Sequence, residues 1–115
     1  MLPDLDYDTA LANMAGLADL YSEALQAFWD EAPALMQLYR QQSMAANWAE
    51  ARRAAHSLKS AAAVIGGIRL SEAAKALEAL ARDEVADASR QHSAWQAAEQ
   101  AWLAFTLAAR PYLPA

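Results

Sequence analysis

A histidine and a lysine one helical turn apart are the residues of this sequence best suited to chemistry. They lie within residues 54–67, a run of mostly small, helix-forming residues. On a helix, Lys59 comes three residues after His56 and occupies a neighbouring part of the same surface. A nearby ammonium disfavours metal binding by the imidazole, because it repels the ion. The same ammonium would stabilise a phosphoryl group carried by the imidazole, so the pair indicates phosphoryl chemistry.

The helix expected around His56 has a regular apolar stripe. Its members follow a 4-3-4-3 spacing: Ala51, Ala55, Leu58, Ala62 and Ile65. At about 100° per residue, His56 lies about 140° from the centre of this stripe, and Lys59 lies at its flank, about 80° away. We therefore expect His56 to face water, with the small residues Ser60 and Ala63 beside it. Another protein could approach such an imidazole closely.

The composition predicts one all-α domain over residues 1–115. Alanine is abundant, and there are only three glycines and four prolines to interrupt helices. Apolar periodicity and breakers predict helices over residues 8–14, 18–43, 47–65, 70–84 and 87–109, the fourth starting at residue 70 or 71. We expect Pro33 to kink or split the second, Asn47 to cap the third and Gly66-Gly67 to end it. The expected fold is an antiparallel four-helix bundle with a short additional N-terminal helix.

Several kinds of site are missing from the sequence. There is no cysteine, which excludes disulfides and thiolate metal sites. No zinc or di-iron motif and no glycine-rich phosphate loop occurs, so we expect no metal, no ATP and no cofactor in this chain. The longest stretch without a polar residue, residues 61–68, is too short to cross a membrane. The acidic N-terminus does not resemble a signal peptide, and we expect the protein to be cytoplasmic.

Charge is unevenly distributed along the chain. Residues 1–39 hold seven acidic residues and no Lys or Arg, whereas residues 40–75 hold six basic residues against two acidic ones. This basic middle region, centred near His56, favours an acidic partner, although solvated helix faces explain it equally well. Nucleic acid is disfavoured by the net charge of −5. A DNA-binding hypothesis would use residues 65–80, where Arg69 and Lys75 are the basic residues.

The other histidine and the aromatic residues show no comparable pattern. His92 has no basic residue one turn later, and we expect it at the surface or at its boundary. We interpret the aromatic set as core rather than as a ligand site. It consists of Trp29, Trp48, Trp95, Trp102 and Phe105.

The region around His56 resembles the histidine-containing phosphotransfer (HPt) domains of bacterial multistep phosphorelays. Their usual signature is roughly A-H-x-L-K-G-x-A-x-x-x-G-x-x-x-L-x-x-x-A-x-x-L-E. The chain matches it at Ala55, His56, Leu58, Lys59, Ala62, Gly66, Leu70, Ala74, Leu77 and Glu78. Upstream, Tyr7-Asp8, Leu20-Tyr21 and Asn47-Trp48 also fit, so the resemblance covers about residues 6–85.

This resemblance implies a phosphocarrier rather than an enzyme. His56 would be phosphorylated and Lys59 would stabilise the phosphate. The expected partners are receiver domains of response regulators, which supply the phosphoaspartate and Mg²⁺, and a hybrid sensor histidine kinase. We expect a monomer, either stand-alone or part of a kinase, whose docking surface comprises Arg52, Arg53, Ser60, Ala63 and Gly67.

One position departs from the family pattern. The residue after the lysine is usually glycine, and here it is Ser60. The added side chain narrows the space for a receiver backbone beside His56. It leaves open an alternative function, a helical docking module for a response regulator or other partner that does not transfer phosphate.

Overall fold

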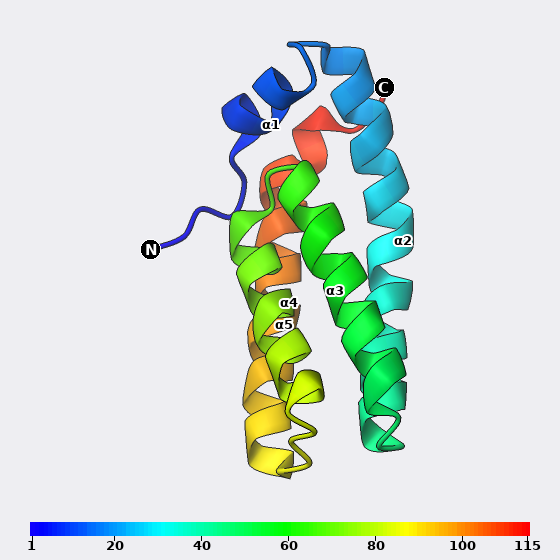
Figure 1. Cartoon of the computed structure of the whole chain (residues 1–115). Helices are drawn as coiled ribbons and strands as arrows, with labels where there is room; N and C mark the ends of the chain where they lie inside the picture. Colours follow the sequence, from blue (N-terminus) through cyan, green and yellow to red (C-terminus); the bar gives the residue numbers. More distant parts are fainter.

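The computed structural model describes all residues 1–115 and is entirely helical. Its elements are α1 (Tyr7–Asn13), α2 (Ala18–Met44), α3 (Trp48–Val64), α4 (Ile68–Arg82), α5 (Ala88–Ala109) and the short 3₁₀ helix η1 (Arg110–Tyr112). The four long helices run alternately up and down, and α1 lies across one end together with the C-terminus (Figure 1). The predicted four-helix bundle with an additional N-terminal helix is therefore confirmed.

Local sequence explains where the helices begin and end. Asp6 caps α1 by accepting a hydrogen bond from the Thr9 amide at 3.2 Å, and Asp87 caps α5 by accepting one from the Arg90 amide at 3.0 Å. Asn47 occupies the N-cap position of α3 but makes no capping bond. Its side-chain amide donates to Oε1 of Gln42 instead, at 2.9 Å.

Pro33 does not split α2, which is one continuous helix of 27 residues. Of the expected kink or split, the split is therefore wrong. Proline lacks one backbone donor and crowds the preceding turn, but Ala32 and Met36 on either side of it are buried in the core. Packing of this face against the bundle holds the helix together, while Pro33 itself is exposed.

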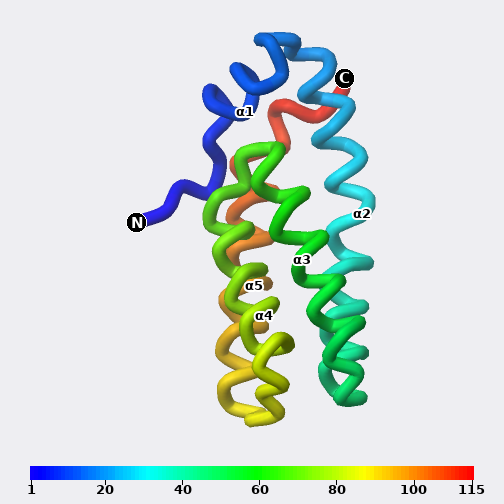
Figure 2. Tube along the Cα trace, viewed as in Figure 1, coloured from blue at the N-terminus to red at the C-terminus, as the bar shows by residue number.

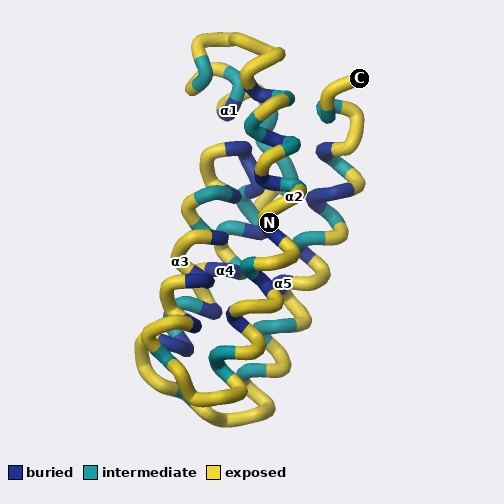
Figure 3. Tube along the Cα trace, turned by 90° about the vertical axis from the view of Figure 1, so that its right-hand side faces the viewer, coloured by how far each residue is buried: buried dark blue, intermediate teal, exposed yellow.

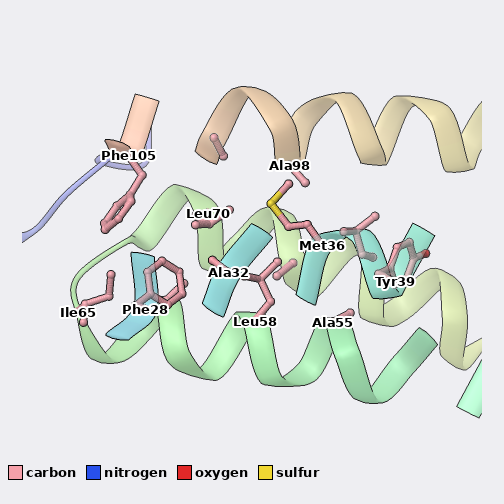
Figure 4. Close-up of a cluster of buried hydrophobic side chains, with 14 of the residues drawn as sticks. Phe28, Ala32, Met36, Tyr39, Ala55, Leu58, Ile65, Leu70, Ala98 and Phe105 are labelled. Carbon is pink, nitrogen blue, oxygen red and sulfur yellow. The ribbon is translucent and has the colours of Figure 1, made fainter. Parts of the chain in front are cut away.

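The core lies between the four long helices. Figure 4 shows buried side chains of α2, among them Phe28, Ala32 and Met36, between α3 and α5. The α3 stripe predicted from the sequence is buried throughout, each of its five residues being at most 2% exposed. Along the four long helices, buried residues recur between exposed ones, as Figure 3 shows. Small alanines on these stripes let the helices approach closely.

The pairing of α2 with α5 differs from the other pairings. Backbones approach each other closely in three helix pairs: α2 with α3, α3 with α4, and α4 with α5. The backbones of α2 and α5 stay farther apart. Aromatic rings fill the space between them: Phe28 lies 5.6 Å from Phe105 and 5.9 Å from Trp102, measured between ring centroids. The bundle is thus closed on this side by large side chains.

The N-terminal segment is fastened to the turn between α3 and α4. The Asp6 amide donates to the Gly66 carbonyl at 2.8 Å, and the Arg69 amide donates to the Pro3 carbonyl at 3.0 Å. The tube in Figure 2 follows this segment past the start of α4 into α1. The contacts fix the turn that joins the two helices carrying the candidate site.

Candidate functional site

His56 projects from the exposed side of α3, opposite the buried stripe. Its side chain is 60% exposed, as the sequence predicts. The neighbouring Ala55 and Leu58 are each 1% exposed and anchor this part of the helix in the core. The imidazole is therefore accessible to solvent while its backbone is held rigidly.

The imidazole has one partner, a carboxylate on the next helix. Nδ1 of His56 lies 2.6 Å from Oε2 of Glu78, which is only 15% exposed. The residues are 22 positions apart in the sequence and meet because α3 and α4 are antiparallel neighbours. Antiparallel packing thus brings a fixed acceptor to one nitrogen of an exposed ring.

The second oxygen of Glu78 binds Lys59. Nζ of Lys59 donates to Oε1 at 2.6 Å, and this lysine is 29% exposed. The hydrogen bond from Lys59 is the main cause that lowers the pKa of Glu78 below its ordinary value. Burial opposes it, and the hydrogen bond with His56 adds to it. Glu78 is accordingly a carboxylate at neutral pH.

An ionised carboxylate only accepts hydrogen bonds, which sets the tautomer of His56. Nδ1 carries the proton and donates it to Glu78, as the distance requires. In the neutral ring, Nε2 then has a free lone pair on the side away from Glu78. The arrangement produces an exposed nitrogen nucleophile whose ring orientation is fixed.

Lys59 is also positioned through its backbone. Its carbonyl accepts a hydrogen bond from Oγ of Ser71 at 2.9 Å, a second polar link between α3 and α4. The His56–Lys59–Glu78 cluster is therefore built on two helices joined by packing and by side-chain bonds. It presents a nucleophile and a cation one turn apart.

The remaining residues predicted for docking lie around His56 with one exception. Arg52, Arg53, Ser60 and Ala63 are all exposed on α3. Arg53 is paired with Glu50 of its own helix at 2.6 Å, an exposed pair of small energetic consequence. The exception is Gly67.

Gly67 does not belong to an exposed surface. It is buried, and a Cβ atom added there would lie 3.2 Å from the Phe105 ring. Its assignment to the docking surface was wrong, because the residue serves the contact between the α3–α4 turn and α5. Gly67 was assigned to the surface because its turn connects α3 and α4, the two helices that carry the site.

His92 and the aromatic residues lie elsewhere. His92 is exposed on α5, as predicted, and is not part of the His56 cluster. Phe105 is fully buried, in agreement with its prediction as core, but the four tryptophans are only partly buried. Trp48 and Trp95 line a cavity at one end of the bundle.

Glu78 is the site residue that sequence reasoning did not assign a role. The sequence feature that could have indicated this role is the position of Glu78 as the last residue of the matched HPt signature, directly after Leu77. Helical spacing alone does not show which residue of α4 faces His56, because that depends on how α3 and α4 are aligned. No group of three or more His, Asp or Glu side chains comes together to hold a metal ion.

The comparison with protein families agrees with the geometry. The family model described as the Hpt domain matches residues 23–107, so the chain belongs to the Hpt domain family. Hpt domains carry a phosphoryl group on a histidine in two-component signalling. No curated protein and no solved structure matches the chain. No helix is both long and apolar enough to cross a membrane.

Proposed function

We propose that this Hpt domain is a phosphorelay intermediate that accepts a phosphoryl group on His56 from a receiver-domain aspartate and passes it to a second receiver. The observation that carries the proposal is the shared carboxylate of Glu78, which lies 2.6 Å from both the imidazole and the Lys59 ammonium. Together these groups supply a nucleophile, a fixed tautomer and a cation. They lack any means of binding ATP, so the phosphoryl group comes from another protein.

The transfer step follows from the tautomer. The Nε2 lone pair of His56 attacks phosphorus, the N–P bond forms, and the bond from phosphorus to the aspartate oxygen breaks. The receiver's aspartate leaves as a carboxylate, and no proton has to leave Nε2. The imidazole becomes a cation that still donates its Nδ1 proton to Glu78, so the carboxylate stabilises the charge that develops on the ring.

In this step, Lys59 acts on the phosphoryl group, whereas Glu78 acts on the imidazole. Phosphoryl transfer passes through a loose transition state, in which positioning and charge neutralisation do most of the work. The Lys59 ammonium shares the Glu78 carboxylate with the imidazole, and we expect it to exchange its bond with Glu78 for one with a phosphoryl oxygen. Reversal of the same step hands the group to the next receiver. Mg²⁺ belongs to the receiver's aspartate site, and this chain needs no cofactor of its own.

The exposed part of α3 is the surface that we expect a receiver to contact. Arg52 and Arg53 are positively charged and would attract an acidic partner. Ser60 and Ala63 have small side chains, which let a partner approach His56 closely. The Ser60 side chain, where relatives of this family usually have glycine, selects receivers that leave room for one hydroxymethyl group. We expect a hybrid sensor kinase upstream, a cytoplasmic location and a monomeric carrier.

The test is transfer of labelled phosphate from a phosphorylated receiver domain to this protein. We expect acid-labile, base-stable label on the wild type, none on His56→Gln, and full labelling of His92→Gln, a matched change of an exposed histidine outside the cluster. Label that persists on His56→Gln would disprove the proposed acceptor. If several receivers bind wild type and His56→Gln equally and none transfers label, the domain is a docking module instead.

A further inference from the structure

A cavity of about 410 Å³ opens at the end of the bundle where α2 turns into α3 and α4 turns into α5. Both turns lie at the same end of the molecule, at the bottom of Figure 1. The cavity is lined by Tyr39, Arg40, Ser43, Met44, Ala46, Trp48, Ala86, Ala88, Gln91, His92 and Trp95. None of these belongs to the His56–Lys59–Glu78 cluster. The volume falls within the range of small-molecule sites.

The cavity exists because the rings that separate α2 from α5 stop short of this end. Near the α3–α4 turn, where Gly67 lies against Phe105, the rings of Phe28, Trp102 and Phe105 fill the space between the two helices. Farther along, the two helices are joined by the Tyr39 hydroxyl, which donates to Oε1 of Gln91 at 2.9 Å. Several of the residues that line the cavity at this end are small, among them Ser43, Ala86 and Ala88.

The Gln91 and Ser43 side chains in the cavity are already paired, whereas the buried indole Nε1 of Trp95 has no hydrogen-bond partner. Gln91 donates its Nε2 to the Val85 carbonyl at 2.8 Å, in addition to accepting from Tyr39. Oγ of Ser43 donates to the Arg40 carbonyl at 3.1 Å. These bonds make this part of the cavity rigid. Arg40 and His92 are the basic side chains of the lining, and neither has a side-chain hydrogen bond or an ion pair, so both are free to bind a ligand.

The charge of the cavity is opposite to that of the protein. The chain has a net charge of −5, but no Asp or Glu lines the cavity. The Arg40 guanidinium lies over the Trp95 ring, 5.4 Å from its centroid, and forms no ion pair. It is held by a cation–π contact that leaves its N–H donors available. An anion is therefore the favoured ligand charge, and the two indoles favour a flat apolar body.

We propose that this cavity binds a small planar aromatic carboxylate. The aromatic body lies against the indoles of Trp48 and Trp95, and the carboxylate is bound by the Arg40 guanidinium, with the exposed His92 imidazole at the same mouth. The proposal does not depend on phosphate transfer, since the two sites share no residue. A ligand bound here would tie the α2–α3 end to the α4–α5 end and stabilise the folded bundle.

The experiment uses 1-naphthoate as the probe and follows the four indole N–H signals by ¹H–¹⁵N NMR. We expect saturable shifts of Trp48 and Trp95 with a Kd below about 1 mM, while Trp29 stays in place. The uncharged analogue 1-naphthalenemethanol should bind at least about tenfold more weakly, because it lacks the charge-assisted bond to Arg40.

Three variants make the test specific. Arg40→Gln should weaken naphthoate binding at least about tenfold, and Arg110→Gln, an exposed arginine outside the cavity, should not. Ser43→Phe fills the cavity and should abolish binding with the bundle intact, which keeps the test decisive if Arg40→Gln perturbs folding. Absence of saturation, equal binding of the uncharged analogue, or shifts centred on Trp29 would each overturn the proposal.

Discussion

Glu78 combines two roles that a single carboxylate can hold only because its two oxygens point to different partners. One oxygen lies 2.6 Å from His56 and the other accepts from Lys59 at the same distance. In the proposed function, the residue thus orients the nucleophile and, before phosphorylation, holds the cation that would later meet the phosphate. Its lowered pKa, caused mainly by Lys59, keeps it ionised under the conditions of transfer.

We predict that Glu78→Gln slows phosphoryl transfer to His56 by about ten- to hundredfold, the range found when a carboxylate that orients a histidine in a metal site is removed. The neutral amide no longer stabilises the imidazolium formed during transfer, and it no longer selects one tautomer. The measurements are the rate of labelling by a phosphorylated receiver and the tautomer of His56 by ¹⁵N NMR.

Glu72→Gln is the matched control, because Glu72 is an exposed glutamate on the same helix and makes no bond to the cluster. It should transfer at the wild-type rate. A Glu78→Gln protein that transfers as fast as wild type, or whose tautomer is unchanged, would show that Glu78 has only a structural role.

The sequence predicted the exposed His56 and the buried α3 stripe correctly, because both follow from position on one helix. It did not predict the role of Glu78, which depends on the alignment of two helices. It also misplaced Gly67, since burial by Phe105 comes from a residue 38 positions away in the chain. Properties of a single helix were therefore predictable, whereas contacts between helices were not.

At the scale of elements, the turn between α3 and α4 determines whether the two halves of the site meet. Gly66 begins this turn in a left-handed conformation with φ = 86°. Its carbonyl accepts the Asp6 amide, and a Cβ atom at this position would lie 2.5 Å from the Asp6 carbonyl oxygen. Only glycine fits both the backbone conformation and the close approach of the N-terminal segment.

We predict that Gly66→Ala destabilises the fold by at least about 3 kcal/mol, because backbone strain and a clash with main-chain atoms add together. Gly16→Ala is the matched control: Gly16 also has a left-handed φ, 73°, but nothing lies within 4 Å of its added Cβ. Gly16→Ala should lower the free energy of unfolding by about 1–2 kcal/mol, which is the cost of backbone strain alone. Urea unfolding of the two variants measures the difference. Equal losses would mean that the N-terminal segment simply moves away.

Helix existence was predictable, but helix ends were less so. The start of α4 lies two residues before the predicted Leu70, because the structure begins the helix directly after Gly67 without a capping side chain. Sequence signals for N-termini rely on such side chains. The persistence of α2 through Pro33 shows the same limit, since tertiary packing, absent from a local pattern, overrides the local cost of proline.

At the scale of the whole molecule, one tyrosine joins the elements at the end of the bundle that carries α1. Tyr21 of α2 is fully buried, and its hydroxyl donates to the Ile65 carbonyl at the end of α3, at 2.7 Å. Its ring packs edge-on against Tyr7 of α1, 4.9 Å away, and Tyr112 of η1, 6.3 Å away, measured between centroids. Residues from both ends of the chain thus meet around one phenol.

We predict that the wild-type protein loses stability between pH 10 and about 12 through ionisation of Tyr21. Burial is the main cause that raises the Tyr21 pKa from 10.0 to about 12, and the neighbouring Tyr7 and Tyr112 add to it. A raised pKa means that the folded state retains a proton that the unfolded state releases. The corresponding stability, about 3 kcal/mol, is fully present below pH 10 and disappears as the pH rises through 12.

Tyr21→Phe should separate this effect from simple loss of a hydrogen bond. At pH 7 it should be about 1 kcal/mol less stable than wild type, because the Ile65 carbonyl loses its donor. Since the variant has no phenol to ionise, its disadvantage should shrink as the pH rises past 10 and reverse at about pH 11, where the wild type has lost about 1 kcal/mol. Tyr112→Phe keeps the ring stacked 3.9 Å from Tyr7. It removes only the smallest of the three causes that raise the Tyr21 pKa, so its profile should stay close to that of the wild type. Parallel curves for wild type and Tyr21→Phe across this range would show that the Tyr21 pKa is the same in the folded and unfolded states, and would contradict the raised pKa.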